Sequence, residues 1–123
     1  MSKLERQLYE SEGRRAEDYA ASWLRFRGYK ILERRYKTRE GEIDLIARKG
    51  KILACIEVKQ RSKDTEAQEA VGYGAEQRIM NTAEIYVNAN PDLLFEDFEL
   101  RFDILYVIGK WKIRHIPDAF RNY

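Results

Sequence analysis

The stretch from Glu42 to Gln60 constrains the fold more than any other part of this chain. Apolar and polar residues alternate along 42–48 and along 51–60, which is the period of a β-strand with two different faces. Lys49-Gly50 lies between the two runs, and glycine there favours a tight hairpin turn. A two-residue turn at this point predicts an antiparallel pair in which the numbers of facing residues sum to 99, so that 44 faces 55 and 42 faces 57.

This register predicts two chemically different faces. The apolar face carries Ile43, Leu45, Ala47, Ile52, Ala54, Ile56 and Val58, and the other carries Glu42, Asp44, Ile46, Leu53, Cys55, Glu57 and Lys59. Asp44 and Glu57 become diagonal neighbours that are close enough to share a cation, and Lys59 follows on the same side. A slip of one residue would move these charges into the core, so the apolar face favours this register.

Two carboxylates and an ammonium group at the end of a paired strand suit divalent-metal phosphodiester chemistry. Carboxylate oxygens are hard ligands that bind Mg²⁺, which takes further ligands from water and substrate phosphate. A nearby lysine such as Lys59 orients an attacking water or stabilises the charge that develops on the phosphate. The same residues also occur as plain ion pairs on a solvated strand face, and that interpretation stays open at this point.

The rest of the chain predicts an α/β domain with a mixed sheet. A strand that ends near Gln60, a following helix and a later strand form a right-handed parallel unit, and the hairpin adds antiparallel strands to it. The predicted elements are a helix over much of Leu4–Arg27, strands over Tyr29–Tyr36, Glu42–Arg48, Lys51–Gln60, Phe98–Ile108 and Trp111–Ile116, a loop or short helix over Ser62–Gly74, and a helix over Ala75–Asn88.

Size and composition favour one soluble domain. The 123 residues fit a single core, and the aliphatic runs are far too short to cross a membrane. No apolar segment follows the first basic residues, so we expect no secretory signal and a cytoplasmic protein. The only cysteine, Cys55, excludes an internal disulfide and a multi-cysteine metal site, and the only histidine, His115, argues against a histidine-based one.

Positive charge is concentrated in the first half of the chain. Residues 1–61 hold 16 basic and 10 acidic side chains (net +6), whereas residues 62–123 hold 7 and 11 (net −4). The basic residues are densest at Arg25, Arg27, Lys30, Arg34, Arg35, Lys37 and Arg39. Such a segment either lies along a nucleic-acid backbone, with Arg34, Arg35 and Arg39 on phosphates, or forms a solvated helix end and strand edge.

The order of motifs resembles a known family. Gly41-Glu42-Ile43-Asp44-Leu45-Ile46-Ala47 followed by Ile56-Glu57-Val58-Lys59-Gln60-Arg61 is similar to the Asp…Glu-x-Lys signature of PD-(D/E)xK nucleases. Over about residues 12–120 the chain resembles the YraN-like family of bacterial proteins, which is similar to archaeal Holliday-junction resolvases. Gly13-x-x-Ala16-Glu17, Arg101-Phe102-Asp103 and His115-Ile116…Ala119-Phe120 carry this likeness.

The resemblance implies a restriction-endonuclease-like fold over 1–123 and assigns roles to individual residues. Asp44 and Glu57 would hold Mg²⁺ or Mn²⁺, with the Val58 carbonyl as a third ligand. Lys59 would be the catalytic lysine, Glu17 an outer acid from the first helix, and Arg61 a phosphate contact. Many relatives carry a lysine early in the second long helix, where this chain has Ala75, Glu76 and Gln77.

Three functional hypotheses follow from the sequence. The leading hypothesis is a metal-dependent endonuclease that acts on DNA, on branched or otherwise structured forms. Resolvases make paired cuts as dimers, so the resemblance suggests a homodimer, although no residue pattern indicates a dimer surface. The second is a nucleic-acid binding module on the same fold that does not cut, and the third is a protein-interaction domain with a charged surface. Asp103 and His115 are expected to be structural, and Cys55 to pack in the core.

Overall fold

Five strands form one sheet in chain order, β1-β2-β3-β4-β5. The computed structural model describes residues 2–63, 73–95 and 97–121. Its elements are α1 (Lys3–Phe26), β1 (Lys30–Lys37), β2 (Glu42–Lys49), β3 (Ile52–Arg61), α2 (Tyr73–Ala89), the 3-10 helix η2 (Pro91–Phe95), β4 (Glu99–Ile108) and β5 (Lys112–Phe120). Most of the loop predicted over Ser62–Gly74 lies outside the described residues.

The sheet is mixed, as the sequence predicts. β3 and β4 are parallel and α2 lies between them in the chain, whereas β1–β2, β2–β3 and β4–β5 are antiparallel. The architecture confirms a single α/β domain with a mixed sheet and two flanking helices, and it is consistent with a restriction-endonuclease-like fold. No helix in the described part of the chain is long and apolar enough to cross a membrane.

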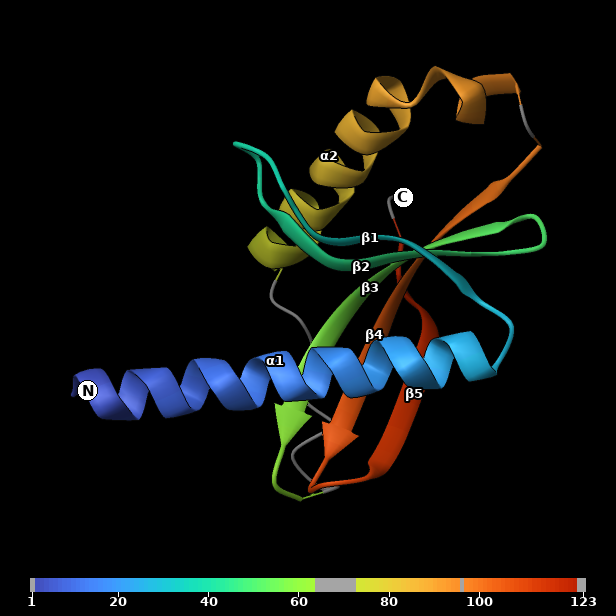
Figure 1. Ribbon diagram of the computed structural model, residues 1–123. Helices are drawn as coiled ribbons and strands as arrows, with labels where there is room; N and C mark the ends of the chain where they lie inside the picture. Colours follow the sequence, from blue (N-terminus) through green and yellow to red (C-terminus); the bar gives the residue numbers. More distant parts are fainter. Residues whose placement is uncertain (1, 64–72, 96, 122–123) are drawn as a thin grey trace.

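A separate hydrophobic core fills each side of the sheet (Figure 1). On one side, small residues of α1 such as Ala16, Ala20 and Ala21 pack on Leu45 and Ile56. Their size lets the helix approach the strands closely. On the other side, Ile79, Ala83 and Tyr86 of α2 pack among the side chains Ile46, Leu53, Cys55, Ile104 and Tyr106. Because both faces are covered, β3 and β4 are apolar on both of their faces.

The hairpin register differs from the prediction by two residues. Lys49 faces Ile52 and Leu45 faces Ile56, so the numbers of facing residues sum to 101. The reason is the turn: Gly50 has φ +59° and is its first central residue, with Lys51 the second. Hairpin turns of the II′ type place glycine at that first position. A shift of two keeps the paired side chains of Leu45–Lys49 and Ile52–Ile56 on their predicted faces, and it moves Asp44 towards Glu57 rather than Cys55.

β2 leaves β3 at Asp44. The pairing with β3 covers Leu45–Lys49, and beyond it the Val58 N–H donates to Asp44 Oδ2 at 2.8 Å. Ile43 consequently joins the core under α2, while Leu45 joins the core under α1, so the prediction that both lie on one face is wrong. The diverging end of β2 continues towards α2, as Figure 1 shows.

Both outer strands of the sheet are irregular. The register of β1 shifts between Ile31 and Glu33, and Arg35 has φ +53°. The pairing of β4 with β5 shifts between Phe102 and Ile104, and β5 contains Pro117 and then Asp118 with φ +56°.

Candidate active site

A cleft of about 800 Å³ lies between α1, the diverging end of the β1–β2 pair and the end of β3. Its lining combines acidic and basic side chains, including three of the four residues predicted to be catalytic. The lining residues are Tyr9, Glu10, Glu12, Gly13, Arg14, Ala16, Glu17, Arg35, Lys37, Glu42, Asp44, Val58, Lys59, Gln60, Arg61, Ser62 and Gly109.

Asp44 stands where β2 separates from β3. Its Oδ2 accepts the Val58 N–H at 2.8 Å, so a side chain of one strand satisfies a backbone donor of the other at the point where the ladder ends. This bond fixes the carboxylate against β3 and directs it into the cleft.

Glu57 lies beside Asp44 on the next strand. Burial, and after it the neighbouring Asp44 carboxyl group, raise the pKa of Glu57 to about 9, although the Lys59 ammonium acts in the opposite direction. Glu57 therefore retains its proton near neutral pH when no cation is bound beside it.

Lys59 follows Glu57 by two residues and lines the same cleft. Because side chains alternate between the two faces of a strand, Lys59 lies on the same side of the sheet as Glu57. Asp44 and Lys59 thus line the cleft, whereas Glu57 is not among its lining residues although its carboxyl group interacts with both.

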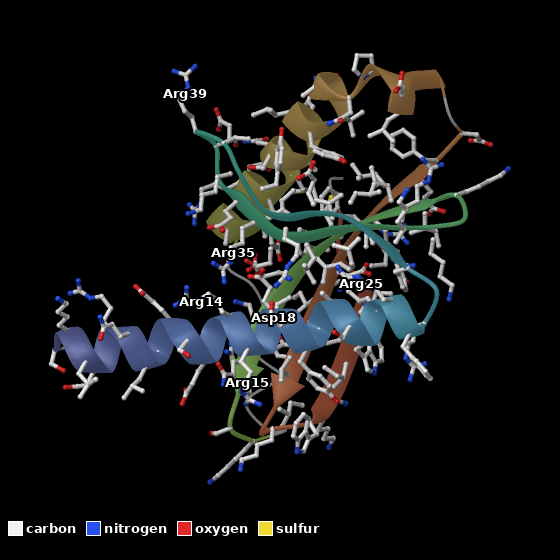
Figure 2. All side chains as sticks on the ribbon, viewed as in Figure 1. Arg14, Arg15, Asp18, Arg25, Arg35 and Arg39 are labelled. Carbon is white, nitrogen blue, oxygen red and sulfur yellow. The ribbon has the colours of Figure 1, made fainter. Side chains whose placement is uncertain are left out.

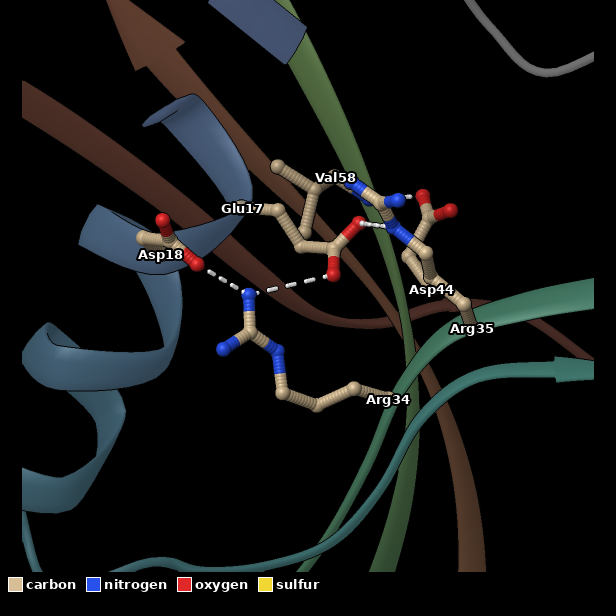
Figure 3. Close-up of polar contacts among 6 residues, drawn as sticks. All are labelled: Glu17, Asp18, Arg34, Arg35, Asp44 and Val58. Carbon is tan, nitrogen blue, oxygen red and sulfur yellow. Dashed lines mark hydrogen bonds and ion pairs between the residues drawn. The ribbon is translucent and has the colours of Figure 1, made fainter. Parts of the chain in front are cut away.

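Glu17 is held by two arginines rather than by the other acids. It is buried on α1, and its Oε1 and Oε2 accept bonds from Arg34 Nη2 at 3.2 Å and Arg35 Nε at 3.0 Å (Figure 3). Arg34 also contacts Asp18. Figure 3 shows the Arg35 guanidinium bound to the Glu17 carboxylate, and both residues line the cleft together with Asp44.

The four predicted phosphate contacts occupy different places. Arg34 and Arg35 face α1, whereas Arg39 lies at the tip of the β1–β2 connection, far from α1 (Figure 2). Arg39 does not line the cleft. Arg61 does, and its Nη1 donates to the Gln60 carbonyl at 2.8 Å while its guanidinium lies 5.7 Å from the centre of the Tyr106 ring.

The donors available to a cation are limited. Within 2–63, 73–95 and 97–121, no group of three or more acidic, histidine or cysteine side chains could hold a metal ion. Two carboxylates, Asp44 and Glu57, and the neighbouring Val58 carbonyl still match Mg²⁺, which keeps several waters and needs few protein ligands.

The sequence did not single out some cleft residues. Arg14, Lys37 and Glu42 all line the cleft. Arg14 precedes Glu17 by three residues on the same helix, a spacing that could have identified it as a neighbour. Gln77, one of the three residues where the resemblance places a lysine, donates to Asn81 within α2 and does not line the cleft.

Other polar residues have structural roles, as predicted. Asp103 is fully buried and accepts bonds from Arg101 and from the Asp118 N–H, and it pairs with His115 Nε2 at 2.8 Å. Burial alone would raise the pKa of Asp103, but these partners lower it below its ordinary value. Burial raises the pKa of Cys55 to about 12, so its thiol is a packing group.

Comparison with known proteins places the chain in a family. The model of "Uncharacterised protein family UPF0102" matches residues 16–107. A UPF0102 protein of Agrobacterium fabrum is 44% identical over 115 residues, covering 94% of this chain and 93% of the relative. One from Bartonella tribocorum is 44% identical over 121 residues, covering 98% and 91%. One from Rhodopseudomonas palustris strain BisB18 is 45% identical over 105 residues, covering 85% and 76%. The chain therefore belongs to the UPF0102 family, the YraN-like proteins.

Proposed function

We propose that this protein is a divalent-metal-dependent endonuclease that hydrolyses DNA phosphodiester bonds, on branched or otherwise structured DNA. The observation that carries the proposal is that Asp44 and Lys59 line one cleft where β2 leaves β3, while the carboxyl group of Glu57, buried behind them, interacts with both. Two carboxyl groups and an ammonium group therefore lie close together at the point where the strand pair opens.

The acidic pair is suited to a shared cation. The high pKa of Glu57 reflects burial beside another carboxyl group, and a divalent cation would remove that penalty by displacing the proton. Asp44, Glu57 and the Val58 carbonyl would hold Mg²⁺ or Mn²⁺. When bound, the metal neutralises phosphate charge and lowers the pKa of a coordinated water.

The basic residues of the cleft would position the substrate. The Lys59 ammonium would orient the attacking water and stabilise the negative charge that develops on the phosphate. Arg61, also in the cleft, would contact a neighbouring phosphate. Arg34 and Arg35 would act mainly through Glu17, which they tie to β1 at the edge of the cleft.

A cleavage assay tests the proposal. We would incubate linear, flapped and four-way DNA with Mg²⁺ or Mn²⁺ and the wild type, Asp44→Asn, Glu57→Gln, Lys59→Ala or the control Glu84→Gln, an exposed acid on α2. We expect each of the three substitutions at Asp44, Glu57 and Lys59 to reduce the rate by at least about 100-fold, and the control to leave it unchanged. Equal cleavage by all five proteins would indicate a contaminating nuclease and contradict the proposal.

One observation favours a second candidate, a DNA-binding module that does not cut. Among the described residues, no three acidic, histidine or cysteine side chains are grouped so as to hold a metal ion, and Glu17 is bound to arginines. This candidate predicts salt-sensitive DNA binding that weakens when Arg34 and Arg35 are replaced by Gln, with no metal-dependent cleavage. Calorimetric titration of Mg²⁺ into the wild type and Asp44→Asn separates the two candidates, since only the nuclease needs binding that depends on Asp44.

A further inference from the structure

We propose that the seam between α1 and β5 binds a single strand of DNA. The seam consists of Tyr19 and Trp23 of α1, Tyr29 just after it, Trp111 at the β4–β5 turn, and His115 of β5. This inference rests on the proposed function and specifies its substrate, as DNA that is single-stranded next to the cleft.

Aromatic rings follow one another along the seam. Tyr19 meets Trp111 edge to face at 5.6 Å between ring centres, and Trp23 meets His115 in the same way at 5.7 Å. Trp111 remains 69% exposed despite its contact with Tyr19. Exposed indole rings stack on nucleic-acid bases of any sequence, because every base presents a flat π-face.

Positive charge accompanies these rings. The Arg27 guanidinium lies 4.3 Å from the centre of the Trp23 ring, and Lys49 Nζ lies 5.3 Å from that of Tyr29. Lys110 and Lys112 stand on either side of Trp111 in the chain. Aromatic side chains combined with a basic groove are typical of surfaces that bind single-stranded nucleic acid.

A hollow of about 690 Å³ lies at the end of the seam that is next to the C-terminus of α1. None of its lining residues is acidic, so nothing among them would repel a phosphate. The lining residues are Trp23, Phe26, Arg27, Tyr29, Lys49, His115 and Pro117. Aromatic walls with three basic side chains match a nucleotide, which carries both a ring and an anion.

The seam is held in place before any ligand arrives. Tyr19 donates its hydroxyl proton to the Trp111 carbonyl at 2.5 Å, which ties the β4–β5 turn to α1. His115 is fixed from behind by the buried Asp103, which Arg101 also holds. A surface that needs little ordering loses less affinity to conformational entropy on binding.

The seam begins at the rim of the candidate active site. Gly109 lines the cleft, and Trp111 is two residues further along the same turn. From Trp111 to His115, four residues of extended chain span roughly 13 Å, the length of about four stacked nucleotides. A strand that leaves the cleft over the β4–β5 turn would therefore meet Trp111 first and the hollow next.

The test measures binding in the absence of cleavage. We would titrate a fluorescent oligothymidylate of about twelve nucleotides in EDTA, with every protein in the Asp44→Asn background. We expect Trp111→Ala to weaken binding about tenfold, Trp111→Phe to retain most of the affinity, and Lys110→Gln to reduce its salt dependence. The control is Leu8→Ala, which removes an exposed apolar side chain from α1 away from the seam.

The outcomes separate this inference from the proposed function. If Trp111→Ala binds the oligonucleotide as tightly as its Asp44→Asn parent, the proposal that the seam binds single-stranded DNA is overturned, even if the wild type cleaves DNA. Binding that depends on Trp111 would support the seam, even if the wild type cleaves nothing. Anionic lipid vesicles are the competing ligand, because an exposed tryptophan between lysines also suits a membrane surface. Trp111-dependent binding to vesicles but not to the oligonucleotide would overturn the inference.

Discussion

At the scale of single residues, Glu57 has the environment that departs most from that of a free side chain. Burial and the adjacent Asp44 carboxyl group raise its pKa from 4.5 to about 9. The folded protein therefore retains a proton on Glu57 over a pH range in which the unfolded chain has lost it. By linkage, the folded state loses stability as pH rises through this range.

We predict that the unfolding free energy of the wild type, measured in EDTA, falls between pH 4.5 and about 9. The unfolding free energy should fall by no more than about 1.4 kcal/mol per pH unit, the value for one titrating proton. Glu57→Gln cannot ionise, so its curve should be flatter and its stability higher than that of the wild type near pH 8. Urea denaturation at a series of pH values measures both curves. Identical slopes for the wild type, Glu57→Gln and the exposed control Glu84→Gln would contradict the assigned environment.

The arrangement around Glu17 shows what residue spacing cannot predict. Its place on the first helix, next to the apolar stripe, is readable from the sequence, and the structure does bury it at the cleft. Its two arginine partners are 17 and 18 residues away and on another element. Arg35 also has a left-handed backbone, which local sequence preference does not favour in an arginine, so the sequence carries no signal for these contacts.

At the scale of elements, the β1–β2 connection shows how close packing positions the site. Thr38 N–H donates to the Gly41 carbonyl at 2.8 Å, which closes the turn. A Cβ atom at Gly41 would lie 3.2 Å from both Arg78 Cβ and Thr82 Oγ1 of α2. Gly41 therefore lets the diverging end of β2 rest on α2, and Asp44 follows three residues later.

We predict that Gly41→Ala destabilises the protein by about 1–3 kcal/mol, because the added methyl group displaces the turn from α2. The matched substitution is Gly13→Ala on α1, where a Cβ would have nothing within 4 Å. It should stabilise the protein by about 0.5–1 kcal/mol through helix propensity. Urea denaturation of both variants measures the difference, and a cost that is equal at the two positions would contradict this role of Gly41.

Elements and faces were predictable from alternation, whereas exact register was not. The hairpin, the parallel β3–α2–β4 unit and the two-sided burial of the sheet all follow from periodicity and chain order. The register depends on which two residues form the turn, and Lys49-Gly50 and Gly50-Lys51 fit the sequence equally well. The departure of Ile43 from its predicted face arises from the Asp44–Val58 bond, which joins two strands and has no signal within either.

At the scale of the whole molecule, the first half of α1 extends beyond the sheet (Figure 1). Residues 2–15 are all exposed, including the apolar side chains of Leu4, Leu8 and Tyr9. The family model begins at residue 16, where the buried part of the helix starts. This overhang, residues 2–15, lengthens the helix but adds no side chain to either hydrophobic core.

We predict that removal of residues 1–8 shifts the melting temperature by less than about 2 °C, since residues 2–8 are exposed and belong to neither hydrophobic core. The helical circular dichroism signal should fall slightly, and differential scanning calorimetry measures the melting temperature. A much larger loss of stability, together with a smaller size in gel filtration, would show that the overhang packs against a second copy.

The irregular outer strands have a consequence for how this molecule meets others. A flat, regular border of a sheet invites another chain to add to it, and repeated addition produces fibres. On one border the ladder is shifted at Ile31 and distorted at Arg35, and on the other it is interrupted at Pro117. Both borders of the sheet are thus irregular, which disfavours the addition of a further strand there.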